Sequence, residues 1–151
     1  MHDRVIVLVE DNANDEELTL RAFRKTKIAN RVVVVRDGAE ALDYFFLRGR
    51  HAARPPTEIA QLVLLDLKLP KVDGLDVLRA LRAAERTRLI PVVVLTSSVE
   101  DQDVVRSYGL GANSYVQKPV DYTQFVEAVR QLGLYWLAIN HAAPPHVFLE
   151  P

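Results

Sequence analysis

The stretch Leu62-Val63-Leu64-Leu65-Asp66 places four aliphatic residues directly before a carboxylate. A short apolar run without polar alternation is typical of a strand that is buried on both faces, as in a parallel sheet. An ionised carboxylate is costly to bury inside such a strand, so we expect Asp66 at the carboxyl end of the strand. Open α/β sheets bind ligands at that edge. Taken alone, Asp66 is equally compatible with a turn residue that has no chemical role.

Four further segments have the apolar character of buried strands, and segments with helical spacing of apolar residues alternate with them. The strands are expected at residues 5–9, 31–35, 91–95 and 114–117, and the helices are expected to begin near residues 14, 37, 75, 98 and 122. Strands that alternate with helices indicate a parallel sheet covered on both faces. We therefore predict an α/β fold with a doubly wound, five-stranded parallel sheet in the order 2-1-3-4-5. The last helix is predicted to extend to about Asn140.

Three local features complete this prediction. Residues 48–61 contain Gly49, Pro55 and Pro56 and are expected to form a surface loop. A capping box, of Ser97 with Glu100 or of Ser98 with Asp101, is expected at the fourth helix. The arginines of the third helix, which are Arg79, Arg82 and Arg86, are interpreted as a solvated face.

The composition excludes several classes of function. Lys and Arg number 19 against 20 Asp and Glu, and a net charge of -1 argues against a nucleic-acid binder that relies on bulk positive charge. The absence of cysteine excludes disulfides, thiol catalysis and thiolate metal sites. The N-terminus lacks the apolar segment of a signal peptide. The apolar run Leu134–Ile139 is far shorter than the roughly 18 residues that span a bilayer. We expect a cytoplasmic protein that does not enter membranes.

Polar residues follow four of the five predicted strands, and strand ends in a parallel sheet share one edge. These residues are Glu10, Asp11, Asp66, Thr96 and Lys118. Each of them alone is compatible with a helix cap, a turn or an ordinary edge position. Together they indicate one site that holds three carboxylates, a hydroxyl and an ammonium group.

The charges of this set favour metal-dependent phosphoryl transfer. Two like charges about 4 Å apart repel by roughly 4 kcal/mol near a protein surface, so three carboxylates require a cation. Oxygen ligands alone suit a hard divalent ion, and Mg²⁺ leaves coordination positions open for phosphate oxygens. Thr96 and Lys118 would bind the remaining phosphoryl oxygens. Asp66 would be the nucleophile, because a carboxylate can accept a phosphoryl group.

The chain resembles the receiver domain of two-component response regulators, the CheY-like fold, over about residues 4–132. The resemblance is carried by the acidic pair Glu10-Asp11, by Asp66 with Pro70 and Gly74 behind it, and by Thr96, Tyr115 and Lys118-Pro119. It implies a receiver domain over residues 1–140 and a tail over residues 141–151, with no output domain.

The resemblance also implies roles for the site residues. Asp66 would accept a phosphoryl group from a phosphohistidine of a sensor histidine kinase, and Thr96 and Lys118 would contact that group. Asp11, Asp66 and the backbone carbonyl of Lys68 would bind Mg²⁺ directly, with Glu10 acting through water. The protein would be no enzyme beyond its own phosphotransfer and dephosphorylation.

Further positions would transmit or tune the signal. Tyr115 would be the switch aromatic that turns inward as Thr96 moves toward the phosphate. Lys68 and Ser98 would flank the path of the attacking water and tune the lifetime of the phosphoaspartate. The resemblance implies a cis peptide bond before Pro119, whereas only about 5–6% of X-Pro bonds in folded proteins are cis.

The overall shape of the chain narrows the family. The long connection of residues 48–61, the missing output domain and the extended last helix are similar to stand-alone regulators that pair with bacterial phytochrome kinases. Residues 134–139 are apolar nearly all round, which predicts a homodimer through Tyr135, Trp136, Leu137 and Ile139, with Tyr115 nearby. The alternative is that the tail from Pro144 to Leu149 folds back over this patch.

Three other functions fit the sequence less well. A phosphohydrolase with an aspartate nucleophile usually carries a second acid two residues later, where this chain has Lys68. A nucleotide-binding protein would need a GxxxxGK[ST] loop, which the sequence lacks. The strongest alternative is a receiver-like adaptor that works without phosphorylation, and the complete set of site residues argues against it.

Overall fold

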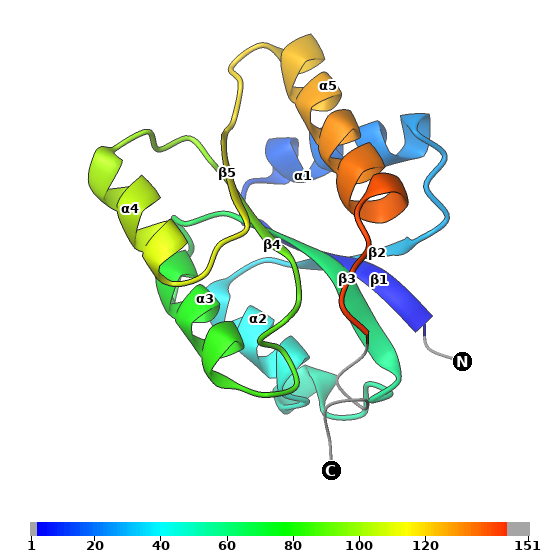
Figure 1. Ribbon diagram of the computed structural model, residues 1–151, viewed down its shortest axis with the longest axis vertical. Helices are drawn as coiled ribbons and strands as arrows, with labels where there is room; N and C mark the ends of the chain where they lie inside the picture. The colour runs from blue at the N-terminus through cyan, green and yellow to red at the C-terminus, as the bar shows by residue number, and fades with distance from the viewer. Residues whose placement is uncertain (1–2, 145–151) are drawn as a thin grey trace.

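Five parallel strands form the central sheet of the computed structural model, which describes residues 3–144 (Figure 1). The strand order is β2-β1-β3-β4-β5, as predicted. The strands are β1 (Asp3–Val9), β2 (Arg31–Val35), β3 (Glu58–Leu65), β4 (Val92–Thr96) and β5 (Ser114–Gln117).

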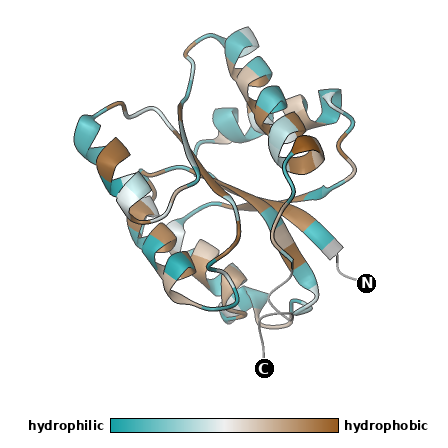
Figure 2. Ribbon diagram, in the orientation of Figure 1, coloured by the Kyte–Doolittle hydropathy of each residue, from teal (hydrophilic) through white to brown (hydrophobic). Residues whose placement is uncertain are grey.

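Helices cover both faces of the sheet (Figure 1). They are α1 (Ala13–Lys25), α2 (Gly38–Phe45), α3 (Gly74–Ala83), α4 (Asp101–Gly109) and α5 (Tyr122–Gly133), with a short 3₁₀ helix η1 (Gly49–His51) and a π-helix η2 (Leu134–Ile139). Side chains alternate across the sheet: Val5, Val7 and Val9 pack toward α2 and α3, whereas Ile6 and Leu8 pack toward α1 and α5. Figure 2 shows these strands as a hydrophobic band through the middle of the molecule.

The third strand begins earlier than the sequence predicted. Ile59 and Ala60 pair with β1, so the end of the expected loop belongs to β3, and only its first part forms η1 and turns. The sequence did not indicate a strand here, because Glu58 and Gln61 interrupt the run of apolar residues. The Arg54 guanidinium fixes the connection by donating hydrogen bonds to the backbone carbonyls of Tyr44 and Glu58.

The predicted capping box at the fourth helix is wrong. Glu100 is the N-cap of α4 and makes no side-chain cap bond, because the helix starts later than expected. The Ser98 hydroxyl instead donates to the Asp103 carboxylate at 2.6 Å and accepts from the Glu100 backbone N–H.

The interpretation of the arginines as one solvated face is correct only for Arg79, which is exposed and pairs with Asp76. Arg86 lies beyond the end of α3. Arg82 is half-buried, and its guanidinium donates to the carbonyls of Gly111, Arg88 and Ile90 and to the side chain of Asn113. It therefore connects α3 to the loop between α3 and β4 and to the loop between α4 and β5.

The last helix changes character at Gly133, where α5 ends and η2 begins. Trp136 and Leu137 pack against the core on the α1 and α5 side, so they are only half exposed. Tyr135 and Ile139 are 48% and 71% exposed. The alternative cover for this patch, the tail up to Leu149, lies outside the described residues from position 145 onward.

Two further findings concern the described part of the chain. Within residues 3–144, no helix has both the length and the apolar character that crossing a membrane requires. No peptide bond there is cis, so the bond before Pro119 is trans, in line with the general frequency for proline and against the family resemblance.

Candidate functional site

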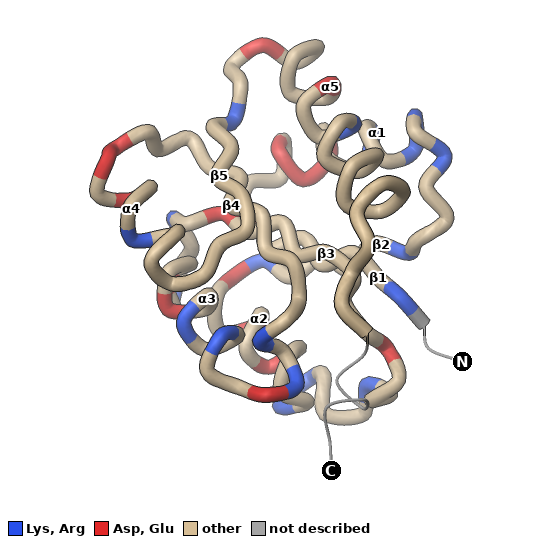
Figure 3. The backbone as a smooth tube through the Cα atoms, in the orientation of Figure 1, with Lys and Arg blue, Asp and Glu red and all other residues tan. Residues whose placement is uncertain are grey.

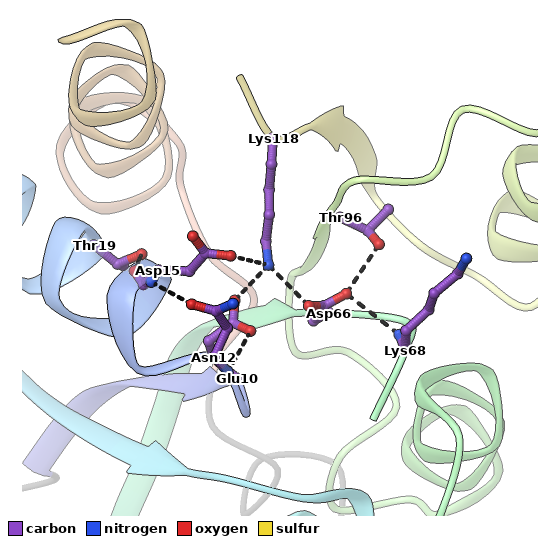
Figure 4. A network of polar contacts seen from close by, with 8 residues as sticks. All are labelled: Glu10, Asn12, Asp15, Thr19, Asp66, Lys68, Thr96 and Lys118. Atoms are coloured by element: carbon purple, nitrogen blue, oxygen red, sulfur yellow. Dashed lines mark hydrogen bonds and ion pairs between the residues drawn. The ribbon is translucent and has the colours of Figure 1, made fainter. Parts of the chain in front are cut away.

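The carboxyl edge of the sheet brings together side chains from strands that are far apart in sequence (Figure 4). Glu10 follows β1, Asp66 follows β3, Thr96 ends β4 and Lys118 follows β5. All four are buried, with exposures of 2%, 8%, 1% and 8%. Buried polar groups of this kind must satisfy one another, because burying an unpaired charge is costly.

Asp66 accepts hydrogen bonds on both oxygens of its carboxylate. Its Oδ1 accepts hydrogen bonds from the Thr96 hydroxyl at 2.9 Å and from the Lys68 backbone N–H at 3.3 Å. Its Oδ2 accepts from the Lys118 ammonium at 2.8 Å. Each carboxylate oxygen therefore already has a donor that a phosphoryl oxygen in the same place could use.

Two glycines allow the loop after Asp66 to pack closely against the starts of α3 and α2. A Cβ on Gly74, the first residue of α3, would lie 2.6 Å from the Cα of Leu67 and closer still to the backbone oxygen of Asp66. A Cβ on Gly38 would lie 2.6 Å from the carbonyl carbon of Val72. Real Cβ atoms do not approach this closely, so both positions require glycine.

The Lys118 ammonium lies among three carboxylates. Its Nζ is 2.7 Å from Glu10 Oε1, 2.8 Å from Asp15 Oδ2 and 2.8 Å from Asp66 Oδ2. Burial opposes the charge of Lys118, but hydrogen bonds to Asp15, Asp66 and Glu10 outweigh it and raise the pKa of the ammonium above its usual value. Lys118 is therefore a permanent cation of the site.

Glu10 is the carboxylate of the site whose pKa is raised by burial. Burial raises its pKa from 4.5 to about 7, although the hydrogen bond and charge of Lys118 act in the opposite direction. In the metal-free site, Glu10 thus carries a proton over part of the physiological pH range.

Asp15 is the residue of this site that the sequence analysis missed. It lies in the first turn of α1, where Figure 3 shows a run of acidic residues. Acidic residues in the first turn of a helix are favoured by the helix dipole. Their presence therefore gives no indication that one of them also contacts a specific side chain. Its place four residues after Asp11, at the start of α1, puts it near the same edge of the sheet, but the sequence does not fix the rotation of α1 that turns its side chain toward the site.

Three carboxylates of the site are placed to bind a metal ion. Oxygen atoms of Glu10, Asp11 and Asp66 lie within 4.8 Å of one another. Asp11 is exposed and the other two are buried, so the cluster opens to solvent on one side. A set of oxygen ligands with no sulfur or imidazole fits a hard divalent cation.

The remaining predicted residues surround this centre. Lys68 contacts Asp66 through its backbone N–H, and Figure 4 shows its side chain pointing away from that carboxylate. The Tyr115 hydroxyl donates to the backbone carbonyl of Ser98 at 2.9 Å, and Ser98 is itself buried. Tyr135, Trp136, Leu137 and Ile139 belong to η2 and form no part of the site.

Both a protein family and individual relatives match this chain over most of its length. The family described as "Response regulator receiver domain" matches residues 6–130. Among its relatives, the "Probable methanogenesis regulatory protein FilR2" of Methanothrix harundinacea is 42% identical over 141 residues, which cover 93% of this chain and 88% of that protein.

Several solved structures have the same fold. The phosphorylated cyanobacterial phytochrome response regulator RcpA is 35% identical with a TM-score of 0.87, covering 95% of this chain and 100% of that one. The Mn(2+)-bound form of response regulator Rcp1, a Synechocystis protein, is 33% identical with a TM-score of 0.87, covering 93% and 99%. The bacteriophytochrome response regulator AtBRR is 52% identical with a TM-score of 0.72, covering 93% and 99%.

Proposed function

Because the chain belongs to the response regulator receiver domain family, we propose that Asp66 is its phosphoacceptor in two-component signal transduction. The observation that carries this proposal is the arrangement of donors on Asp66. Thr96 and Lys118 contact opposite oxygens of its carboxylate, at 2.9 and 2.8 Å. The carboxylate also lies in the acidic cluster, so a phosphoryl group there would be neutralised from several sides.

The chemical step follows from these positions. A carboxylate oxygen of Asp66 forms a bond to the phosphorus of a phosphohistidine while the P–N bond breaks. The imidazole nitrogen keeps the electron pair of that bond and takes up a proton. The Thr96 hydroxyl and the Lys118 ammonium then donate to phosphoryl oxygens in place of the carboxylate oxygens that they contact now.

A divalent cation, which we propose to be Mg²⁺, would supply charge neutralisation and positioning of the phosphoryl oxygens. Asp11, Asp66 and the backbone carbonyl of Lys68 would hold it, and Glu10 would contribute through water. The support is the oxygen-only cluster of Glu10, Asp11 and Asp66, together with the Mn(2+)-bound form of the similar Rcp1.

The same site would return the protein to its resting state. Water attacks the phosphorus of phospho-Asp66, the O–P bond to Asp66 breaks, and inorganic phosphate leaves. Lys68 and Ser98 are the residues that we propose to tune this rate. Beyond this transfer and hydrolysis on its own side chain, we propose no enzymatic activity.

Tyr115 is the proposed link from the site to the surface. Its hydroxyl binds the Ser98 carbonyl, two residues after Thr96, at 2.9 Å. If Thr96 moves toward a phosphoryl group, the β4–α4 segment moves with it and this hydrogen bond is strained. The tyrosine ring would then turn inward and change the surface around β5.

A receiver domain of this family implies a histidine kinase as partner. We propose that this kinase is of the phytochrome type, because RcpA and AtBRR are named as phytochrome and bacteriophytochrome response regulators. The test is transfer of labelled phosphate from an autophosphorylated phytochrome kinase, compared with a kinase that has another sensor. Equal or faster transfer from the second kinase contradicts this assignment.

We also propose that the chain forms a homodimer through η2. Tyr135 and Ile139 supply exposed apolar surface, and a groove beside them is lined by Val116, Leu132 and Trp136. Trp136 and Leu137 would contribute only their outer faces, since they also pack on the core.

Sedimentation velocity at micromolar concentration tests the dimer. The double variant Tyr135→Ser/Ile139→Ser should be monomeric, whereas Leu89→Ser, which changes a similarly exposed leucine elsewhere, should remain dimeric. A wild-type protein that is already monomeric contradicts the proposal.

The proposed phosphorylation is tested by incubating the protein with Mg²⁺ and acetyl phosphate and measuring its intact mass. The expected result is one added phosphoryl group, absent in Asp66→Asn and after chelation, and retained in the control Asp76→Asn. Asp76 is exposed and pairs with Arg79 at the surface. A wild-type chain that gains no mass would favour the adaptor that works without phosphorylation.

A further inference from the structure

The three carboxylates around Lys118 are not equivalent. An ammonium group has three N–H donors, and Glu10, Asp15 and Asp66 lie at 2.7, 2.8 and 2.8 Å from Nζ. Glu10 and Asp66 belong to the acidic cluster that fits a cation, and Asp15 does not. Asp15 is therefore the one partner of Lys118 that a bound cation would leave in place.

The position of Asp15 is fixed by the first turn of α1 (Figure 4). Its backbone N–H donates to the Asn12 side chain at 3.0 Å, and its carbonyl accepts from the Thr19 hydroxyl at 2.8 Å. Thr19 is fully buried, so this turn is anchored in the core. The Asp15 carboxylate is held against Lys118 by the helix and needs no contact with Asp66 to stay there.

A phosphoryl group on Asp66 needs the same ammonium. Its oxygens bring further negative charge to a place where every donor of Lys118 already has a carboxylate. A cation draws Glu10 and Asp66 toward itself, but Asp15 continues to occupy one donor and adds a negative charge close to the phosphoryl oxygens. Like charges at this range repel, more strongly in a partly buried site than in water.

We propose that Asp15 is a positioning residue that competes with the phosphoryl group for the Lys118 ammonium. Asp15 thereby weakens binding of the phosphoryl group at the site. It strengthens binding of the cation, because it draws Lys118 away from Glu10 and Asp66. This inference rests on the proposed phosphorylation of Asp66. Through Asp15, α1 influences how long Asp66 stays phosphorylated.

Calorimetric titration with beryllofluoride, a phosphoryl mimic, in the presence of Mg²⁺ tests the proposal. Asp15→Asn should bind beryllofluoride roughly fivefold more tightly than the wild type, and should bind Mg²⁺ alone more weakly. The matched control is Glu17→Gln, which removes the same charge from the same helix at an exposed position paired with Arg24. Asp15→Glu, which keeps the charge, should stay close to the wild type.

Opposite shifts for the anion and the cation are a result that a purely structural role of Asp15 does not produce. Weaker or unchanged beryllofluoride binding by Asp15→Asn, or an equal gain in Glu17→Gln, overturns the proposal. If Asp15→Asn fails to fold, the Asp15→Ser variant replaces it, with circular dichroism as the check. A wild-type protein that binds no beryllofluoride, or an Asp66→Asn variant that binds it as well, overturns the proposed function itself.

Discussion

The ammonium of Lys118 lies 2.8 Å from Asp66 Oδ2, although the two residues are 52 positions apart in sequence. The contact bridges the carboxyl ends of β5 and β3 across the end of β4, from which Thr96 contacts the other oxygen of the same carboxylate. In this buried setting a charge-assisted hydrogen bond is strong. Through these two contacts, the Asp66 carboxylate at the end of β3 joins the ends of β4 and β5.

The protonation of Glu10 predicts how stability depends on pH. Its pKa is about 7 in the folded protein and near 4.5 in the unfolded chain, so the folded state binds the extra proton between these values. The stability that this proton contributes is fully present below pH 4.5 and is lost as pH rises through 7. The slope of about 1.4 kcal/mol per pKa unit gives a loss of at most about 3.5 kcal/mol.

Urea unfolding in the presence of a chelator measures this effect. The free energy of unfolding of the wild type should fall relative to that of Glu10→Gln between pH 5 and pH 7.5. Lys118 does not contribute in this window, because its pKa lies above its usual value. A difference between the two proteins that stays constant with pH contradicts the assignment.

The same proton should oppose cation binding. Glu10 must be ionised to attract a divalent ion, so below pH 7 the ion has to displace the proton. The affinity for Mg²⁺ should rise between pH 6 and pH 8 by up to about tenfold and level off above pH 8. Titration calorimetry in two buffers with different ionisation enthalpies detects the released proton. An affinity that does not change from pH 6 to pH 8 argues against this coupling.

Gly74 is predicted to be required for the position of Asp66. In Gly74→Ala the new Cβ meets the Cα of Leu67 at 2.6 Å, so α3 must move away from the strand end. We expect a loss of about 1–3 kcal/mol in the free energy of unfolding and slower phosphorylation by acetyl phosphate. Gly109→Ala is the control, because nothing lies within 4 Å of its Cβ. A Gly74→Ala variant as stable and as reactive as the control would contradict the close approach.

Arg82 is predicted to stabilise the fold more than its sequence position suggests. Arg82→Met keeps much of the side-chain volume and removes hydrogen bonds to Gly111, Ile90 and Asn113. The expected cost is about 1.5–3 kcal/mol in chemical denaturation. Arg79→Met removes only an exposed pair with Asp76 and should change stability by less than about 0.5 kcal/mol. Equal effects of the two substitutions would show that the hydrogen bonds of Arg82 contribute nothing to stability.

Most of the fold was predictable because the strands of a sheet covered on both faces are continuous apolar runs. This holds for residues 5–9, 62–65 and 92–95, whose exposures are close to zero. The start of β3 was not predictable in this way, since Glu58 and Gln61 lie at the edge of the core and interrupt the pattern. The change from α5 to η2 has no such signal, because apolar residues on all sides suit either kind of helix.

The site was predictable where topology alone brings residues together. Strand ends converge in any parallel sheet, so Glu10, Asp66, Thr96 and Lys118 could be grouped without coordinates. Asp15 could not, because its contact depends on the rotation of α1 about its own axis. That rotation is set by packing of buried residues such as Phe23 against the sheet.

The central claim is that Asp66 is the residue that carries the phosphoryl group. Borohydride reduces an acyl phosphate on aspartate to homoserine and leaves an unmodified carboxylate unchanged. After treatment with Mg²⁺ and acetyl phosphate, then borohydride, peptide mass spectrometry should find homoserine at position 66 and at no other aspartate. Homoserine at Asp11 or Asp15, or an unreduced Asp66 in a protein that has gained a phosphoryl group, would contradict the account.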